Sequence, residues 1–215
     1  MLEYDGCVVD DLQVNNLRII QRKGGFKFGS DAVALVNFVN VRPVGVALDI
    51  GSGTGIIPIL LAGKLGFGTV YGVEIDTDMA TLSQQSVQLN NLQNSIKIIN
   101  APIQDISQYL SAGSCTVITS NPPFNKVGCG QVSGNDSIAQ ARFECSLTLQ
   151  ETLKAASYLL STGGKLYMIH QIYRLAEIMY ECTTVRLQPK VIKLVDSKRF
   201  LVQCTKDAKV GLLIR

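Results

Sequence analysis

From residue 45 onward, short runs rich in β-branched residues alternate with longer stretches of helical character. Neighbouring parallel strands need a long crossover connection, and a helix usually provides it. The alternation therefore predicts an α/β fold in which a mostly parallel sheet carries helices on both faces. The expected strands are residues 46–50, 70–75, 96–99, 115–120, 166–169, 191–195 and 200–204, which makes seven.

Helices are expected in the connections, over residues 55–65, 77–90 and 138–160. Gly163-Gly164 is expected to end the last of them, because glycine commonly terminates helices. Residues 1–40 lie outside the alternation, so we expect a short N-terminal extension that packs on a main domain of residues 41–215. A length of 215 residues suits one domain with such an extension.

Composition argues against several classes of protein. No stretch approaches the ~20 apolar residues that span a bilayer, so we expect no membrane association. Residues 1–5 are acidic and polar, unlike a signal peptide. The single histidine and six scattered cysteines form no CxxC pair, so we expect no metal site. Reduced thiols of this kind are typical of a cytoplasmic protein.

A glycine-rich turn, residues 49–55, joins the first expected strand to its helix. Gly51, Gly53 and Gly55 alternate strictly as GxGxG, whereas a loop that binds a dinucleotide pyrophosphate reads GxGxxG. Asp49 precedes the glycines by two positions and would repel a phosphate. The same carboxylate would attract an ammonium group, such as the amino-acid end of S-adenosylmethionine. The turn and Asp49 are therefore candidate cofactor-binding residues.

Glu74 lies at the carboxyl end of the second expected strand, next to its last residue, where its carboxylate could accept hydrogen bonds from both hydroxyls of a ribose. The adjacent Ile75 is a further candidate cofactor-binding residue. Ligands of open α/β sheets bind beyond the carboxyl ends of the strands. Because the glycine turn, Glu74 and Asn121 all follow strands, one cleft is expected to hold the cofactor and to present Asn121 to it.

Residues 121–124 read Asn-Pro-Pro-Phe directly after the expected strand 115–120. Two prolines fix two backbone φ angles and remove two donors, and the first also biases Asn121 toward an extended conformation. The loop therefore presents an amide, carbonyls without competing N–H groups, and an aromatic face. An exocyclic NH2 on a planar ring needs acceptors for two hydrogens and a surface on which to stack. Asn121, Pro122 and Phe124 are the predicted catalytic residues.

The glycine turn and Asn-Pro-Pro-Phe resemble class I S-adenosylmethionine-dependent N-methyltransferases, and other segments resemble the bacterial tRNA(Val) adenine-N6 methyltransferase family. These segments are residues 10–13, 19–21, 26–33, 139–144, 163–165 and 174–178. The resemblance implies a Rossmann-like class I fold and S-adenosylmethionine as cofactor. It implies methylation of the adenine at tRNA position 37 by a monomer that binds the anticodon loop. It also implies a cofactor role for Asp31, within the segment 26–33.

Two positions depart from the pattern. Phe124 stands where this family more often has tyrosine, and guanine-N2 methyltransferases of ribosomal RNA often carry Asn-Pro-Pro-Phe. Pro102 stands where many class I enzymes place an aspartate that holds the cofactor adenine. Either Asp105 takes that role or Ile103 only packs on the ring. The alternatives that stay open are a guanine-N2 methyltransferase, a protein-glutamine methyltransferase, and an RNA-binding module with an inactive cofactor site.

Basic residues gather in two parts of the chain, early and late, and we expect both groups to flank the cleft and bind phosphates. They are Arg18, Arg22, Lys23 and Lys27, and Lys190, Lys193, Lys198, Arg199, Lys206 and Lys209. His170, the single histidine, ends an expected strand, and we expect it to have a structural role.

Overall fold

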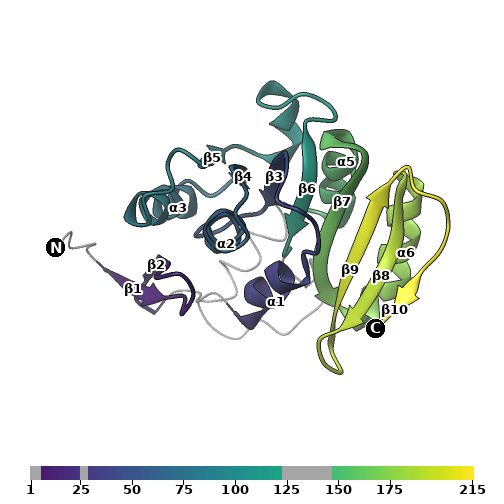
Figure 1. Ribbon diagram of the computed structural model, residues 1–215, viewed down its shortest axis with the longest axis horizontal. Helices are drawn as coiled ribbons and strands as arrows, with labels where there is room; N and C mark the ends of the chain where they lie inside the picture. Colours follow the sequence, from purple (N-terminus) through teal and green to yellow (C-terminus); the bar gives the residue numbers. More distant parts are fainter. Residues whose placement is uncertain (1–5, 25–28, 123–146) are drawn as a thin grey trace.

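An eight-stranded sheet forms the centre of the computed structural model, which describes residues 6–24, 29–122 and 147–215 (Figure 1). The strand order is β10-β8-β9-β7-β6-β3-β4-β5. The bounds are β3 Val46–Ile50, β4 Thr69–Glu74, β5 Ile96–Asn100, β6 Cys115–Ser120, β7 Leu160–Gln171, β8 Leu187–Leu194, β9 Arg199–Lys206 and β10 Leu213–Ile214. Every neighbouring pair is parallel except those that β9 makes with β7 and β8. The predicted mostly parallel sheet is confirmed, and the two-residue strand β10 is added at its edge.

Helices cover both faces of the sheet, as predicted. One face carries α1, Ser30–Phe38, α2, Ile56–Gly63, and α3, Thr77–Leu89. The other carries η1, Ile103–Gln108, α5, Leu149–Leu159, and α6, Leu175–Thr184, with the short η2, Ile172–Arg174, before α6. None of the helices in the described ranges is both long and apolar enough to pass through a membrane.

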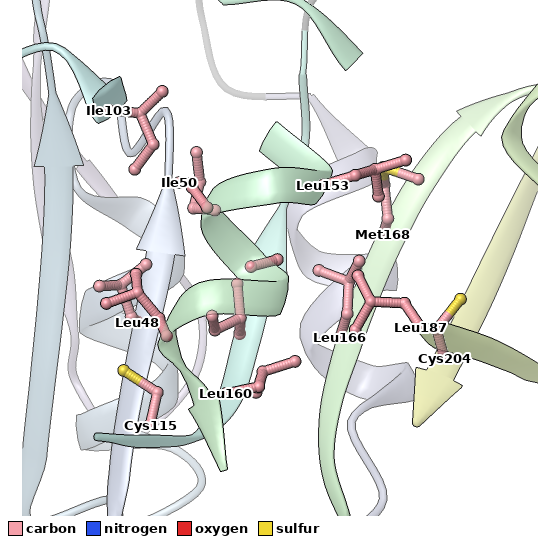
Figure 2. Close-up of a cluster of buried hydrophobic side chains, with 14 of the residues drawn as sticks. Leu48, Ile50, Ile103, Cys115, Leu153, Leu160, Leu166, Met168, Leu187 and Cys204 are labelled. Atoms are coloured by element: carbon pink, nitrogen blue, oxygen red, sulfur yellow. The ribbon is translucent and has the colours of Figure 1, made fainter. Parts of the chain in front are cut away.

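Alternate residues of β3 pack on opposite faces of the sheet, because successive side chains of a strand point in opposite directions. Leu48 and Ile50 join the core under α5, where Leu153 and Met168 also pack (Figure 2). Ala47 joins the second core, under α1 and α2. The central strands are therefore buried on both sides, which explains why their sequences read as continuous apolar runs.

The expected helix over residues 138–160 ends where predicted to within one residue but is not continuous, because α5 begins at Leu149, and the expectation that Gly163-Gly164 terminates it is wrong. Thr148 caps α5 through a capping box with Glu151, and the helix ends at Leu159. Both glycines lie inside β7, where the pairing with β6 shifts register and Gly163 has a φ of +79°. They permit an irregular strand instead of terminating a helix. Residues 138–146 lie outside the described ranges.

The described part of the expected extension packs on the main sheet. Strands β1, Cys7–Asp11, and β2, Arg18–Arg22, form an antiparallel hairpin that lies beside α3 (Figure 1). Ile19 shares a core with α1 and α2, and the Ile20 N–H donates to Ser86 Oγ at 3.0 Å. Helix α1 then reaches β7. A domain boundary at residue 41 stays a prediction.

Candidate functional site

The carboxyl ends of β3, β4 and β6 meet at one edge of the sheet. Ile50 of β3 pairs in register with Val73 of β4 and with Ser120 of β6. The glycine turn lies at this end of β3, Glu74 is the last residue of β4, and Asn121 directly follows β6. The structure therefore brings together the three segments that the sequence indicates, and we call this edge the carboxyl edge.

The glycine turn holds its shape through backbone bonds and left-handed residues. Gly51, Gly53 and Gly55 have φ angles of +73°, +53° and +87°, a region that glycine enters without steric cost. The N–H groups of Gly51 and Ser52 both donate to the Val73 carbonyl at 3.0 Å. A Cβ added at Gly53 would meet no atom within 4 Å, so the turn borders open space. A ligand can approach the backbone closely there.

Glu74 fastens the turn to β4. Its side chain is buried, with Oε2 accepting from the Gly53 N–H at 2.7 Å and Oε1 accepting from the Asp76 N–H at 2.9 Å. Burial raises the pKa of this carboxyl, and the two backbone donors act in the opposite direction. Each carboxylate oxygen can accept more than one hydrogen bond, so Glu74 can hold the turn and still bind hydroxyl groups.

Asp49 lies in the interior directly below the turn, with no exposed surface. Oδ1 accepts from Thr119 Oγ1 at 2.6 Å, whereas Oδ2 has no hydrogen-bond partner in the described part of the chain. Burial raises the pKa of Asp49 to about 8, and the nearby Glu74 adds to the rise. A buried acceptor without a donor is costly. It suits a ligand that brings N–H donors and positive charge.

Two polar residues that the sequence reasoning missed complete this edge. Thr119 holds Asp49, and Asn100, at the end of β5, donates from Nδ2 to the carbonyls of Glu74 and Ile75 at 2.8 and 3.2 Å. Both occupy strand positions near the carboxyl edge, which is the signal that could have found them. Their role is to fix the backbone and the carboxylate around the site.

The remaining predicted cofactor residues have different surroundings. Ile103 begins η1 and is buried in the core under α5, whereas Asp105 and Ile75 are exposed. Asp31, in the first turn of α1, forms an ion pair with Arg199 of β9. Burial is the main influence on the pKa of Asp31 and raises it, while Arg199 opposes the rise. The cofactor roles of these residues stay predictions.

Asn121 directly follows β6 and is half-buried. The end of β6 is fixed because Ser120 Oγ donates to the Ile50 carbonyl at 3.1 Å. Within the described ranges, the Asn121 amide makes no hydrogen bond, so it is available to a ligand, and Pro122 beside it is buried. Phe124, the third predicted catalytic residue, lies outside these ranges.

His170 is buried near the end of β7, where Arg174 Nη1 lies 3.4 Å from its Nε2. Burial, and secondly the Arg174 charge, lower the pKa of His170 to about 4. The ring is therefore neutral near pH 7. Arg174 also forms a two-pronged pair with Glu177, at 2.9 and 3.0 Å. The cluster joins β7 to α6, which suits the structural role expected for this histidine.

Some of the basic residues lie near the carboxyl edge of the sheet, and others lie at the opposite ends of the strands. Arg22 pairs with Asp78 at 2.7 Å in the first turn of α3, on the side of the carboxyl edge. Lys206 lies at the opposite edge, where its Nζ donates to the carbonyls of Ser157 and Leu160 at 2.6 and 2.7 Å. The expectation that every late basic residue borders one cleft is therefore wrong for Lys206 and for Lys209, which follows it at that edge. Lys27 lies outside the described residues.

S-adenosylmethionine has a chemical group to match each of these features. Its amino group would supply donors and charge to Asp49 Oδ2, its ribose hydroxyls would reach Glu74, and its chain would fill the open space beside Gly53. The residues present therefore fit this group. A metal ion has no such counterpart, since the described residues contain no group of three or more His, Cys, Asp or Glu that could hold one.

Relatives of known name are similar over most of the chain. A protein of Porphyromonas gingivalis named tRNA1(Val) (adenine(37)-N6)-methyltransferase is 32% identical over 167 residues, which are 75% of this chain and 65% of that protein. A protein of the same name from Trichodesmium erythraeum is 30% identical over 199 residues, covering 87% of this chain and 81% of its own length. A third, from Photorhabdus laumondii, is 32% identical, and only 56% of its length is covered. The chain thus spans less than two thirds of the first and third relatives.

Solved structures share the fold. A protein of Agrobacterium tumefaciens described as a predicted O-methyltransferase aligns with a TM-score of 0.67 at 21% identity, covering 86% of this chain and 85% of that one. TrmN from Thermus thermophilus aligns with a TM-score of 0.62 at 19% identity, covering 81% of this chain and 48% of that one. At these identities the likeness shows the fold alone, and it confirms the predicted Rossmann-like architecture. The family model described as methyltransferase small domain matches residues 16–183, and the chain belongs to that family.

Proposed function

We propose that this protein transfers a methyl group from S-adenosylmethionine to the exocyclic N6 amine of an adenine in tRNA, at position 37 of a tRNA(Val). The observation that carries the proposal is the position of Asn121, whose available amide follows the strand next to the glycine turn. The names of three relatives support the same substrate. We further propose that the protein acts as a monomer on the anticodon loop, in the cytoplasm.

Asp49, the glycine turn and Glu74 would hold the cofactor. The Asp49 carboxylate would bind the ammonium, Glu74 would accept from the ribose hydroxyls, and Gly53 would leave room for the chain between them. Bound S-adenosylmethionine supplies an electrophilic methyl group on a sulfonium. Ile75, Ile103 and Asp105 are the candidates to border its adenine.

Asn121 and Pro122 would act on the substrate base. The N6 lone pair of adenine is delocalised into the ring, which makes the nitrogen a weak nucleophile. If Asn121 Oδ1 and the Pro122 carbonyl accept the two N6 hydrogens, the nitrogen can pyramidalise and direct its lone pair at the methyl group. Catalysis then comes mainly from positioning and oriented dipoles, and the alkylated amine loses its proton to water.

Phe124 is the proposed stacking surface for the base. Stacking on an aromatic ring is worth ~1–3 kcal/mol per base in single-stranded recognition. The base must leave its own stack to enter such a pocket, which is least costly for a nucleotide in a loop. This part of the proposal rests on the sequence of residues 121–124.

The test is mass spectrometry of nucleosides from total tRNA that has been incubated with the protein and methyl-labelled S-adenosylmethionine. We expect labelled N6-methyladenosine. Labelled N2-methylguanosine would instead identify a guanine-N2 methyltransferase. Transfer of the label to protein in a ribonuclease-treated extract would indicate a protein-glutamine methyltransferase. Absence of S-adenosylmethionine binding in calorimetry would leave only an RNA-binding module.

A further inference from the structure

Four exposed residues lie at the same edge of the sheet as the candidate site, at the ends of β7 and β8 and in the turn before β9. They are Tyr173, Lys193, Leu194 and Lys198, and we call them the β7–β9 rim. Tyr173 is 70% exposed and Leu194 is 53% exposed. An exposed aromatic ring and an exposed aliphatic side chain at the same edge as two lysines form a surface that the cofactor site does not use.

The rim lies at the carboxyl edge, on the side of Asn121 that faces away from the glycine turn. Ser120 pairs with Met168 of β7, and β7 continues for three residues to Gln171, which pairs with Arg199. Strand spacings of about 4.8 Å and rises of about 3.3 Å per residue place Gln171 roughly 8 Å from Asn121. In Figure 1, β6 points toward the lower part of the view, and the turn between β8 and β9 lies lower still.

The backbone under the rim is fixed. The Ile172 N–H donates to the Lys198 carbonyl at 2.8 Å, which ties η2 to the turn before β9. Within that turn, Asp196 Oδ1 accepts from the N–H groups of Lys198 and Arg199, both at 2.8 Å. Tyr173 and Lys198 therefore project from two segments that hold each other in place, so little ordering is required when a ligand binds.

The charges of the rim favour an anionic partner. Arg199 pairs with both nearby carboxylates, Asp196 at 2.6 Å and Asp31. The amino groups of Lys193 and Lys198 form no ion pair or hydrogen bond with any residue in the described ranges, and both side chains are exposed. Among the described residues of the rim and the turn before β9, they are the cations that remain for a ligand.

We propose that the β7–β9 rim binds the nucleotides that flank the target base, with a base stacked on Tyr173 and phosphates beside Lys193 and Lys198; this inference rests on the proposed RNA substrate. Aromatic rings combined with nearby cations are the usual means of holding single-stranded RNA without reading its sequence. The short distance from Asn121 suits nucleotides adjacent to the base that receives the methyl group.

The chain offers matched controls for both residue types. Tyr180 is 68% exposed, nearly as much as Tyr173, but it belongs to the middle of α6 and not to the β7–β9 rim. Lys209 is exposed and follows Lys206, at the opposite edge of the sheet from Lys198. Substitution of Tyr180 or Lys209 removes the same chemistry from the same molecule without changing the rim.

The experiment measures the affinity of the full chain for a short RNA stem-loop with adenine in its loop, over a range of salt concentrations. Tyr173→Ala should weaken binding about tenfold or more, while Tyr173→Phe and Tyr180→Ala should bind like the unmodified protein. Lys198→Ala should reduce the slope of log affinity against log salt by about 1, and Lys209→Ala should leave it unchanged. Unaltered S-adenosylmethionine affinity in calorimetry would show that the variants are folded.

Equal RNA affinity of the Tyr173→Ala and Tyr180→Ala variants would overturn the inference. This failure is distinct from failure of the proposed function, which is judged by the methylated nucleoside that the unmodified protein produces. If the protein methylates tRNA adenine but the Tyr173→Ala variant binds RNA normally, the proposed function stands and the proposed role of the β7–β9 rim is wrong. Loss of binding in both tyrosine variants would equally count against a specific rim.

Discussion

Asp49 combines complete burial with one carboxylate oxygen that lacks a partner among the described residues. Because burial raises the pKa of Asp49 to about 8, much of the cofactor-free protein holds this carboxyl protonated at neutral pH. An ammonium beside it would favour the ionised form. Cofactor binding at this residue would therefore displace a proton.

We expect the affinity for S-adenosylmethionine to rise between about pH 6 and pH 8, by up to about tenfold per unit, since one pKa unit corresponds to ~1.4 kcal/mol. Calorimetry in buffers of different ionisation enthalpy would detect the released proton. Asp49→Asn should bind weakly and with little pH dependence. Thr119→Val, which removes the hydrogen bond to Oδ1, should move the rise to higher pH.

The same titration acts on stability, and its sign follows from the raised pKa. The folded, cofactor-free protein binds this proton more tightly than the unfolded chain, whose Asp49 titrates near 3.8. Its contribution to stability is complete below that value and is lost as the pH rises through about 8. Urea unfolding of Asp49→Asn beside the unmodified protein should show a flatter dependence, and identical pH profiles would contradict the assignment.

Asn121 is expected to act on turnover more than on cofactor binding. Removal of one oriented hydrogen-bonding group from a transition state commonly costs 10²–10³-fold in rate. Asn121→Ala should therefore lose about that much turnover on tRNA while its S-adenosylmethionine affinity stays close to normal. Asn100→Ala is the contrast, because Asn100 holds the backbone of Glu74 and Ile75 and should affect the cofactor KM. Normal turnover by Asn121→Ala would exclude the role.

Sequence reasoning could find Asp49, Glu74 and Asn121 because each has a recognisable place relative to a strand. A position near the end of a strand was the only local sign of Thr119, whose importance comes from a contact with Asp49, 70 positions away in the chain. Sequence reasoning could not show that Asp31 forms an ion pair with Arg199, 168 positions away. Such contacts depend on how strands and helices are arranged, which no local pattern contains.

At the scale of elements, the glycine turn contains two glycines with different constraints. A Cβ at Gly55 would lie 2.2 Å from Ser83 Oγ of α3, whereas a Cβ at Gly53 would meet no atom within 4 Å. Both have positive φ angles, which cost an L-residue roughly 1–2 kcal/mol. The absence of a side chain at Gly55 therefore allows α3 to pack against the turn, and its absence at Gly53 leaves space for a ligand.

Alanine substitutions should separate these roles. Gly55→Ala should lower the free energy of unfolding by clearly more than the ~1–2 kcal/mol of backbone strain, because Ser83 is fully buried and must move. Gly53→Ala should show only the strain but should lose cofactor affinity, since the methyl group enters the open space. Urea unfolding and calorimetry on both variants would check this, and equal losses of stability would contradict it.

The strands of the sheet were predictable because each is a short apolar run, and the seven expected strands are all present. Helix α6 and the hairpin β1–β2 were not predicted. Only Ile178 and Cys182 of α6 are buried, and β1 has no fully buried residue. Helix α6 and strand β1 contact the core so sparsely that they leave a weak periodic signal, whereas the buried residues of β2, Ile19, Ile20 and Gln21, are consecutive and show no alternation. The wrong expectation for Gly163 has another cause, because glycine is common both at helix ends and at irregular positions in strands.

At the scale of the whole molecule, Arg199 connects the first part of the chain to the last. It pairs with Asp31 of α1 and with Asp196 beside β9. The Asp31 side chain is only 13% exposed, so Arg199→Ala would leave a largely desolvated carboxylate without its partner. Hydrogen bonds to charged groups contribute about 1.5–3 kcal/mol, and partial exposure of Arg199 places the expected loss near the lower end.

The pH dependence of this loss has a defined sign. Without Arg199 the pKa of Asp31 would rise further, so the defect should be largest near pH 7 and shrink as Asp31 becomes protonated in acid. Asp31→Asn combined with Arg199→Ala should recover part of the stability. Arg22→Ala, which breaks the more exposed pair with Asp78, should change stability by less than about 1 kcal/mol. A defect that does not vary with pH would contradict the coupling.

The strand order also determines how the protein opens. Strands β3, β4 and β6, which carry the turn, Glu74 and Asn121, are all interior strands, whereas β10 and β5 form the outer edges. Local unfolding generally starts in peripheral elements with few contacts. Amide hydrogens of Leu213 and Ile214 should therefore exchange with solvent long before those of Leu48. Transient fraying of the periphery would leave the cofactor-binding strands intact, so the site should persist in partly opened forms of the protein.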